Sequence, residues 1–538
     1  MSAQTEDRRS KVPFYTFPGN REQQEEALAA NPMLKRFVWS RTALAGDRHR
    51  PYYHYVNPEG TLNDPNGLCF WNGLWHLFYQ GYPPEDPRQH WGHCVSEDLI
   101  HWRDLPYAIY PDPEECCFSG ATLVEEDRVI AIYHGTKAGN MVATSSDPLL
   151  LNWEKLTGQA VIPMTAPDGG ELPYRVFDPC IWRKGDFYYS LSGGTLPHPT
   201  NGVRTRANFL LRSRDMETWE YLHPFIEGDT MTKLGDDGAC PYFWPIGQGD
   251  RERHMLLFYS HMSGGQALLG DYDKDRDKFV VTSLHEANFG ASGPGGVHAP
   301  SATPDGEGGV IVIYNMNPGR VRRGWDQIMT LPRRLTLRAD EGRVRDQMAV
   351  EPAGDIESLR SNEVSLTDVA LPANEEVVLD KVAGDALELE LEIADGDASV
   401  IELNVLRSPG AEEYTRFSFY RSRGFRNWAR YGGWEPAGLR AATDSIAMLD
   451  NSHSSILDDV SARPPEQAPV YLAPDEPLQL RVFVDRSVVE VFVNGRQCVA
   501  LRCYPGRLDS TGISLRAGGA PAQVTRLRAW QMANLFAR

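Results

Sequence analysis

An acidic residue between two asparagines opens the most distinctive stretch of the chain. Asn63-Asp64-Pro65-Asn66-Gly67 leads directly into an aromatic-rich run, residues 68–80. Asn, Asp, Pro and Gly are common turn residues, so one interpretation is a plain turn. A carboxylate fixed on such a turn, beside aromatic rings on which a ring-shaped ligand can stack, is also typical of a sugar site. Asp64 is therefore the first candidate for chemistry.

Composition limits the partners of such a site. The 538 residues suggest roughly two to four domains, and the 10% aromatic and 24% charged content is typical of a globular protein. The net charge of −19 argues against nucleic acid or an anionic membrane surface as the main partner and favours a neutral ligand. The first ten residues lack an apolar run, and no stretch approaches the ~18 apolar residues of a membrane span, so we expect a cytoplasmic chain.

Eight cysteines are scattered along the chain without any Cys-x-x-Cys pair. This spacing indicates neither a zinc site nor a disulfide framework, so we expect free and mostly buried thiols. The histidines near the start of the chain show no metal-ligand spacing either.

Changes in residue composition and patterning along the chain predict the domains that must position Asp64. Residues 1–47 predict an N-terminal helical strap, with Asn20 as a helix cap and a break near Asn31-Pro32. Residues 48–345 contain short aromatic or β-branched runs broken by turn residues, which indicates an all-β domain. We expect a linker over 346–364 and an antiparallel β-sandwich over 365–538, where residues 387–393 alternate and Asn494-Gly495 predicts a hairpin turn.

A repeated Ser-x-Asp motif, followed by tryptophan, organises the first β domain. Its aspartates are Asp98, Asp147 and Asp215, roughly 50 to 70 residues apart, a spacing compatible with four-stranded propeller blades. Matching inner strands are predicted at residues 75–79, 129–133, 187–191, 255–259 and 310–314. Five such runs predict a five-bladed β-propeller, the alternative being a set of unrelated hairpins.

Five motifs taken together resemble one enzyme family. They are residues 63–67, 79–80, 91–102, 118–121 and 483–492, in this order. The chain is similar in these stretches to glycoside hydrolase family 32, the invertase, fructanase and levanase family. The resemblance implies a five-bladed propeller that carries the active site, a C-terminal β-sandwich, and retaining hydrolysis of β-fructofuranosides such as sucrose, fructo-oligosaccharides or fructans. A retaining double displacement requires no metal, so we expect no cofactor.

The resemblance also implies roles for individual residues. Asp64 matches the nucleophile that forms a fructosyl-enzyme, and Asp178 matches the aspartate that stabilises the transition state. Residues that match positions around the bound fructose are Asn63, Gln80, Trp91, Phe118 and Ser119. His298 and Trp325 fall where the later blades reach the pocket and are further candidates for its lining.

Two departures from the family pattern affect the site. The arginine that normally precedes Asp178 is replaced by Phe177, and Arg175 would lie on the same side of an extended strand. The glutamate that serves as acid/base is replaced by Ala239, in Asp236-Asp237-Gly238-Ala239-Cys240-Pro241. Alanine cannot transfer a proton, and losing a general acid typically costs about 10²- to 10⁴-fold.

Three explanations of Ala239 stay open at this point. Asp237, two residues earlier, would face the same side of an extended segment and is our candidate for the acid/base, whereas Asp236 would face away. A second explanation is an introduced substitution that traps substrate. The third is a non-catalytic or inactivated fructoside-binding propeller. Among active enzymes, a fructosyltransferase is the alternative to a hydrolase.

Overall fold

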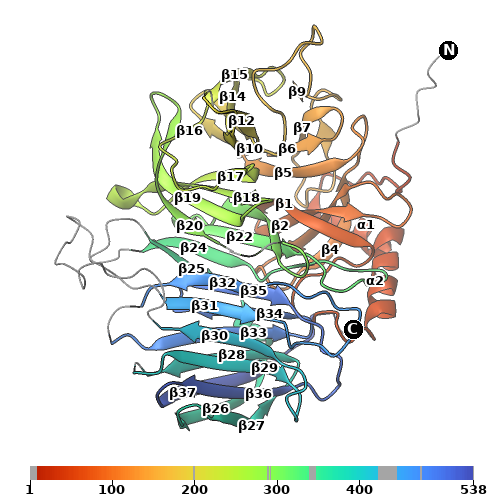
Figure 1. Ribbon diagram of the computed structural model, residues 1–538. Coiled ribbons are helices and arrows are strands. Elements are labelled where there is room, and N and C mark those ends of the chain that lie inside the picture. Colours follow the sequence, from red (N-terminus) through yellow and green to blue (C-terminus); the bar gives the residue numbers. More distant parts are fainter. Residues whose placement is uncertain are drawn as a thin grey trace.

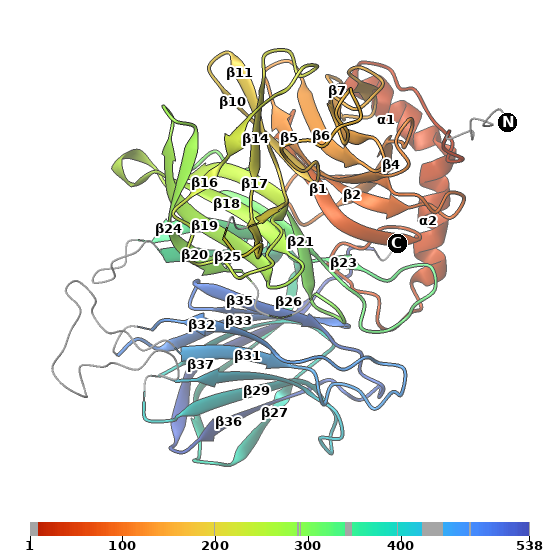
Figure 2. The same cartoon turned by 45° about the horizontal axis from the view of Figure 1, so that its top comes forward.

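The computed structural model describes residues 9–197, 200–287, 290, 292–338, 347–394, 396–421, 445–472 and 475–536. Within these ranges the strands form five blade-like sheets around a common axis, followed by two six-stranded sheets (Figures 1 and 2). The predicted fold class, an all-β chain with a five-bladed propeller and a C-terminal β-sandwich, is confirmed.

Each blade is built on four antiparallel strands that follow one another along the chain. The first blade contains β1 (Thr61–Trp71), β2 (Leu74–Tyr82), β3 (His90–Ser96) and β4 (Arg103–Ile109). The second contains β5 (Cys117–Val124), β6 (Val129–Gly135), β7 (Gly139–Ser145), β8 (Glu154–Lys155) and β9 (Ile162–Pro163). The third contains β10 (Pro179–Lys184), β11 (Phe187–Ser192), β14 (Phe209–Ser213) and β15 (Glu220–Pro224), with a separate ribbon of β12 (Thr195–Pro197) and β13 (Arg204–Arg206).

The last two blades each have an additional short strand. The fourth contains β17 (Ala239–Ile246), β18 (Arg253–Ser260), β19 (Gly264–Asp273) and β20 (Lys278–Glu286), with β16 (Ile226–Glu227) parallel to β20. The fifth contains β21 (Val297–Pro304), β22 (Val310–Met316), β24 (Arg333–Arg338) and β25 (Gln347–Pro352), with β23 (Ile328–Met329) paired to β22.

The first strand of every blade is the innermost one. β1 contacts both β5 and β21, and β10 and β17 close the ring between them. The strands predicted as inner ones belong instead to β2, β6, β11, β18 and β22, the second strand of each blade. The prediction counted the blades correctly because these second strands, paired on both sides, have the most regular apolar patterns. It was wrong about which strand faces the axis.

The Ser-x-Asp motifs lie in the loops between the third and fourth strands of their blades. Ser96 donates a hydrogen bond to Asp98, and Asp98 accepts the backbone N–H groups of Ile100 and His101. The corresponding bonds occur at Asp147 and Asp215. The motif therefore recurs because each blade makes the same side-chain-stabilised turn.

The N-terminal strap consists of two helices at the edge of the first blade (Figure 1). α1 (Arg21–Ala30) is capped by Asn20 as predicted, and α2 (Pro32–Leu44) is capped by Asn31. Arg41 of α2 forms an ion pair with Asp104 of β4 at 2.6 Å. No helix in the described ranges is long and apolar enough to cross a membrane. All eight cysteines are free, and seven of them are buried.

The two sheets of the C-terminal domain pack face to face. One contains, in spatial order, β26 (Arg360–Leu371), β37 (Ala522–Met532), β28 (Ala386–Ile393), β33 (Leu478–Asp485), β34 (Val488–Val493) and β35 (Gln497–Arg502). The other contains β27 (Glu376–Ala383), β36 (Gly512–Gly518), β29 (Val400–Arg407), β30 (Thr415–Tyr420), β31 (Ser445–Asp450) and β32 (Glu466–Val470). Leu387, Leu389 and Leu391 of β28 face the shared core, which explains the alternation in this strand. Both Asn494 and Gly495 have the positive φ that their hairpin turn requires.

The connection between the domains is shorter than the predicted linker over 346–364. β25 pairs with β24 as part of the fifth blade, and β26 already begins at Arg360 of the sandwich. The charged composition of this stretch resembles that of a linker, but its strands are edge strands, which also carry charged residues.

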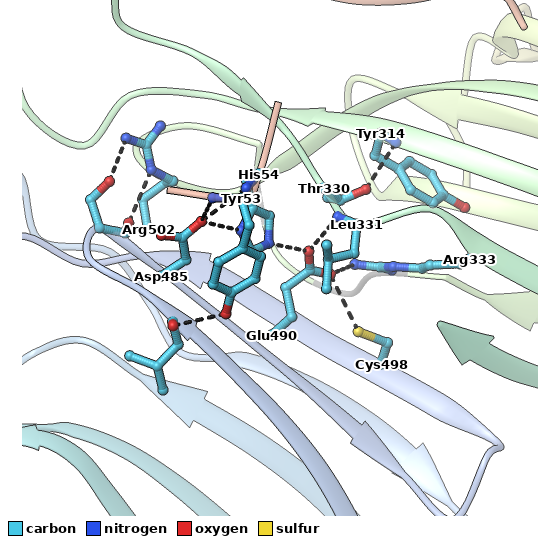
Figure 3. Close-up of polar contacts among 12 residues, drawn as sticks. Tyr53, His54, Tyr314, Thr330, Leu331, Arg333, Asp485, Glu490, Cys498 and Arg502 are labelled. Atoms are coloured by element: carbon cyan, nitrogen blue, oxygen red, sulfur yellow. Dashed lines mark hydrogen bonds and ion pairs between the residues drawn. The ribbon is translucent and has the colours of Figure 1, made fainter. Parts of the chain in front are cut away.

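A buried polar network joins the two domains (Figure 3). His54, just before β1, lies between two carboxylates of the sandwich, with Nδ1 2.9 Å from Asp485 and Nε2 3.0 Å from Glu490. Glu490 also accepts hydrogen bonds from the backbone of Leu331 at 2.7 Å and from the guanidinium of Arg333 at 2.8 Å. The motif at residues 483–492 thus contributes to the domain interface.

Candidate active site

A small pocket opens where the N-terminal ends of the innermost strands meet. Its volume is about 140 Å³. Among the residues that line it are Asn63, Asp64, Gln80, Phe118, Ser119, Phe177, Asp178, Ala239, Cys240, Tyr259, His261 and His298. The propeller therefore brings together side chains from all five blades, and most of the candidates predicted from the sequence are among them.

A repeated β-bulge presents these side chains. Leu62 of β1 pairs with Gly81 of β2, and Pro65 pairs with Tyr79, so β1 has one extra residue between these two pairs. The same one-residue bulge occurs at the start of β5, β17 and β21. The bulged segments carry Asn63-Asp64, Phe118-Ser119, Cys240-Pro241 and His298-Ala299. A bulge bends the strand and redirects its side chains, so it turns them from the blade faces toward the axis.

Asp64 lies at the base of the pocket and is nearly fully buried. Its Oδ2 accepts hydrogen bonds from Ser119 Oγ at 2.5 Å and from Gln80 Nε2 at 3.2 Å. Its Oδ1 lies 3.1 Å from His298 Nδ1 and has no hydrogen bond of good geometry within the described residues. Burial alone would raise the pKa of Asp64, but the charge of His298 and the hydrogen bonds lower it below the usual range. The carboxylate is therefore ionised, and Oδ1 is the oxygen that accepts no hydrogen bond of good geometry from the described residues.

A chain of amides fixes this carboxylate from the side. Asn63 Nδ2 donates to Gln80 Oε1 at 3.1 Å, and Asn315 Nδ2 donates to Asn63 Oδ1 at 3.1 Å. Each amide orients the next one, so the Gln80 amide group is held with its NH₂ toward Asp64. Asn315 is a contributor that the sequence alone did not indicate.

We expect Ser119→Ala to move the acid limb of the pH–rate profile to higher pH. Loss of the Ser119 hydrogen bond removes one of the effects that lower the pKa of Asp64, and the carboxylate must be ionised to react. Hydrogen bonds to charged groups contribute about 1.5–3 kcal/mol, so kcat/KM should fall by about 10- to 100-fold. The profile of kcat/KM against pH measures both effects, and an unchanged acid limb would contradict the assigned role of Ser119.

Asp178 provides the second carboxyl group of the pocket. Its Oδ2 accepts the backbone N–H of Cys240 at 3.1 Å, and Cys240 Sγ lies 3.5 Å from Asp178 and 3.8 Å from Asp64. Burial, followed by the negative charge of Asp64, raises the pKa of Asp178 to about 7. Cys240 has a positive φ of 46°, which turns its N–H and sulfur toward the carboxyl groups. The two carboxyl groups thus share a neighbour but differ in protonation near neutral pH.

Ala239 is buried in the pocket wall, so the structure offers no carboxyl at this place. Asp237 is part-exposed, and its Oδ2 lies 2.6 Å from His261 Nδ1. Asp236 is buried and accepts hydrogen bonds from Ser260 and Ser263, which shows that it faces away as predicted. His261 lines the pocket beside Ala239, and sequence reasoning missed it. The one signal in the sequence for His261 as a pocket residue is its position just after β18, the second strand of the fourth blade.

Four predicted site residues do not line the pocket: Asp237, described above, and three others. Trp91 is fully buried behind it and donates its indole N–H to the carbonyl of Phe118 at 2.9 Å. Arg175 is exposed, with its backbone carbonyl bound by Ser192, so it does not replace the arginine missing at Phe177. Trp325 is buried among Asp47, Arg50 and Arg502 near the sandwich. Trp91 shapes the pocket indirectly, whereas Trp325 contributes to packing.

Two carboxyl groups with separated pKa values, in a pocket of this size, suit cleavage of a glycosidic bond. The fold and the pocket together define a propeller-type glycoside hydrolase. Comparison with known proteins agrees: residues 54–348 match the glycosyl hydrolases family 32 N-terminal domain, and residues 355–531 match its C-terminal domain. The chain belongs to glycosyl hydrolase family 32.

Individual relatives are distant but similar over nearly their whole length. Fructan 6-exohydrolase of Beta vulgaris is 25% identical, with 90% of this chain and 87% of the relative covered. Sucrose-6-phosphate hydrolase of Escherichia coli is 27% identical, with 90% and 96% covered. The crystal structure of fructan 1-exohydrolase IIa from Cichorium intybus superposes with a TM-score of 0.75 at 22% identity, covering 91% of this chain and 98% of the other.

Proposed function

We propose that this protein hydrolyses β-fructofuranosides with retention of configuration, through a fructosyl-enzyme on Asp64. The observation that carries the proposal is the buried, ionised Asp64, whose Oδ2 accepts hydrogen bonds from Ser119 and Gln80 and whose Oδ1 lies against His298 in the pocket. Relatives of this chain are named fructan 6-exohydrolase, sucrose-6-phosphate hydrolase and β-fructofuranosidase, which supports a fructoside as the substrate.

In the proposed reaction, each of these residues has a distinct part. Asp64 attacks the anomeric carbon C2 of the fructosyl unit through Oδ1 and forms an ester, and water later cleaves this ester on the same face. Asp178, with a pKa of about 7, binds fructose hydroxyl groups and stabilises the charge that develops on the ring in the transition state. Phe118 and Phe177, which line the pocket, provide apolar contacts for the sugar.

Methanol as a competing acceptor tests this proposal directly. Incubation with sucrose, inulin or levan in the presence of methanol should give free fructose and methyl β-fructofuranoside, which nuclear magnetic resonance distinguishes from the α-anomer. The β-anomer is expected because two inversions at C2 give net retention. Formation of the α-anomer would contradict a fructosyl-enzyme. Fructosyl transfer to sucrose in preference to water would identify a transferase, and binding without any product would identify a fructoside-binding protein.

A further inference from the structure

A histidine that follows the neighbouring strand lines the pocket in which the family glutamate is missing. β17 pairs with β18 so that Ala239 lies opposite Tyr259. His261 follows Tyr259 by two residues, and the two rings lie 5.3 Å apart, centroid to centroid. Ala239 and both rings line the same pocket. An imidazole is therefore present next to the alanine that cannot transfer a proton.

Asp237 holds this imidazole in one orientation. Asp237 Oδ2 lies 2.6 Å from His261 Nδ1, and Oδ1 accepts the backbone N–H of His261 at 3.3 Å. Because an ionised carboxylate only accepts hydrogen bonds, Nδ1 carries the proton of this pair. Nε2 has no hydrogen-bond partner within the described residues. In Ser-His-Asp triads, a carboxylate on one ring nitrogen likewise leaves the other nitrogen to transfer protons.

The surroundings favour the protonated form of His261. The hydrogen bond to Asp237 raises its pKa above the usual value, burial opposes this, and the negative charges of Asp237, Asp178 and Asp64 add to the increase. The titratable side chains that face the ring from neighbouring elements are Asp237 before β17, Asp178 before β10, Asp64 of β1, Tyr259 of β18 and His298 of β21. An imidazolium can therefore exist beside the ionised Asp64 at neutral pH.

We propose that His261 is the proton donor and acceptor of the reaction, in place of the glutamate, and that Asp237 is its positioning residue. This inference rests on the proposed function, in which Asp64 forms the fructosyl-enzyme. In the first step, the Asp64–C2 bond forms while the C2–oxygen bond to the leaving sugar breaks, and the leaving oxygen takes the bonding electrons and a proton from Nε2. In the second step, water attacks C2, gives a proton to Nε2 and releases Asp64 as a carboxylate.

Two substrates that differ in their need for a proton test the inference. Sucrose has an alkoxide leaving group that must be protonated, whereas β-fructofuranosyl fluoride releases fluoride ion without the help of a proton donor. For His261→Ala we expect kcat/KM on sucrose to fall by about 10²- to 10⁴-fold, as for loss of a general acid. On the fluoride, whose kcat/KM reports only formation of the fructosyl-enzyme, the fall should stay within about 10-fold.

A second His–Asp pair provides a matched control. His101 Nδ1 lies 2.6 Å from Asp98 Oδ2, in a loop between β3 and β4 outside the pocket. His101→Ala should retain turnover of both substrates. If His261→Ala loses both substrates equally, its role is structural and the inference is wrong. The nucleophile is tested separately, because Asp64→Asn must lose both substrates, and retention of fluoride turnover there would contradict the proposed function instead.

The variant Asp237→Asn distinguishes positioning from direct catalysis. Since His261 must be protonated in the first step, kcat/KM on sucrose falls as the pH rises through its pKa. Asparagine lacks the charge that raises this pKa, so the basic limb should move to lower pH while fluoride turnover persists. If His261→Ala keeps sucrose turnover and either Asp237→Asn or Asp178→Asn abolishes it, one of those carboxyl groups is the acid and the inference is overturned.

Discussion

We expect Asp64→Asn to abolish fructoside turnover while leaving the pocket intact. Asparagine has nearly the same shape and keeps an oxygen that can accept the hydrogen bonds of Ser119 and Gln80, but it cannot form the ester. Removing a nucleophile in comparable enzymes costs on the order of 10⁴-fold or more in kcat. Fructose release from sucrose, inulin and levan measures the loss, and calorimetric titration with the same sugars tests whether binding is retained.

The matched control is Asp215→Asn, which changes an exposed aspartate in the loop after β14. This variant should keep full turnover, although the loss of one turn-stabilising carboxylate will lower stability slightly. Normal turnover by Asp64→Asn would exclude the fructosyl-enzyme on this residue. A loss of both binding and turnover would instead mean that the negative charge at residue 64 is needed to build the pocket.

Glu490→Gln is expected to cause the largest loss of stability. Glu490 is fully buried between His54 and Arg333, and the amide removes the charge that compensates Arg333 and one of the two carboxylates that compensate His54 (Figure 3). Breaking a buried ion pair by removing one partner costs about 3–5 kcal/mol. Urea and thermal unfolding should show a lower midpoint, beginning with separation of the sandwich from the propeller. Glu220→Gln, which breaks an exposed ion pair with Arg212, should change the midpoint far less.

The same network sets a pH window for stability. Burial alone would lower the pKa of His54, but Asp485 and Glu490 raise it to about 9. The contribution of His54 to the free energy of unfolding is therefore complete below about pH 6.5 and is lost as the pH rises through 9. Burial alone would raise the pKa of Glu490, but Arg333 and His54 lower it to about 2. The contribution of Glu490 to the free energy of unfolding is therefore complete above about pH 4.5 and is lost as the pH falls through 2. We expect the interface to be most stable between about pH 4.5 and 6.5, and Glu490→Gln to flatten this dependence. A variant with the parent's pH dependence would contradict the assignment.

The interface also explains why the motif at residues 483–492 accompanies the propeller motifs without contributing to the pocket. Asp485 and Glu490 stand at the end of β33 and on β34, on either side of a tight turn, and reach His54 just before β1. The sequence predicts a sandwich strand here, and the structure has β33 and β34 in this stretch. The partner of the two acidic residues lies at the far end of the chain, so no local pattern could reveal it.

Local patterns were sufficient for the architecture. The cap at Asn20, the Ser-x-Asp turns and the alternation around Leu387 each depend on contacts within a few residues, so they are visible in the sequence. The blade count followed from repeats of the same local unit. The order of the strands within a blade could not be predicted in this way. The second strand, which is paired on both sides, has a more regular apolar pattern than the bulged innermost strand.

The sequence by itself determined the all-β fold, the family resemblance and the candidates Asp64 and Asp178. Only the tertiary structure decided which side chains meet. Closure of the propeller brings Asp178 and Cys240 to Asp64, the bulges redirect side chains toward the axis, and the pairing of Ala239 with Tyr259 sets His261 beside the missing glutamate. Trp325 and Arg175 were misplaced for the same physical reason: a side chain's direction depends on strand register and bulges, which arise from contacts between distant segments rather than from neighbouring residues.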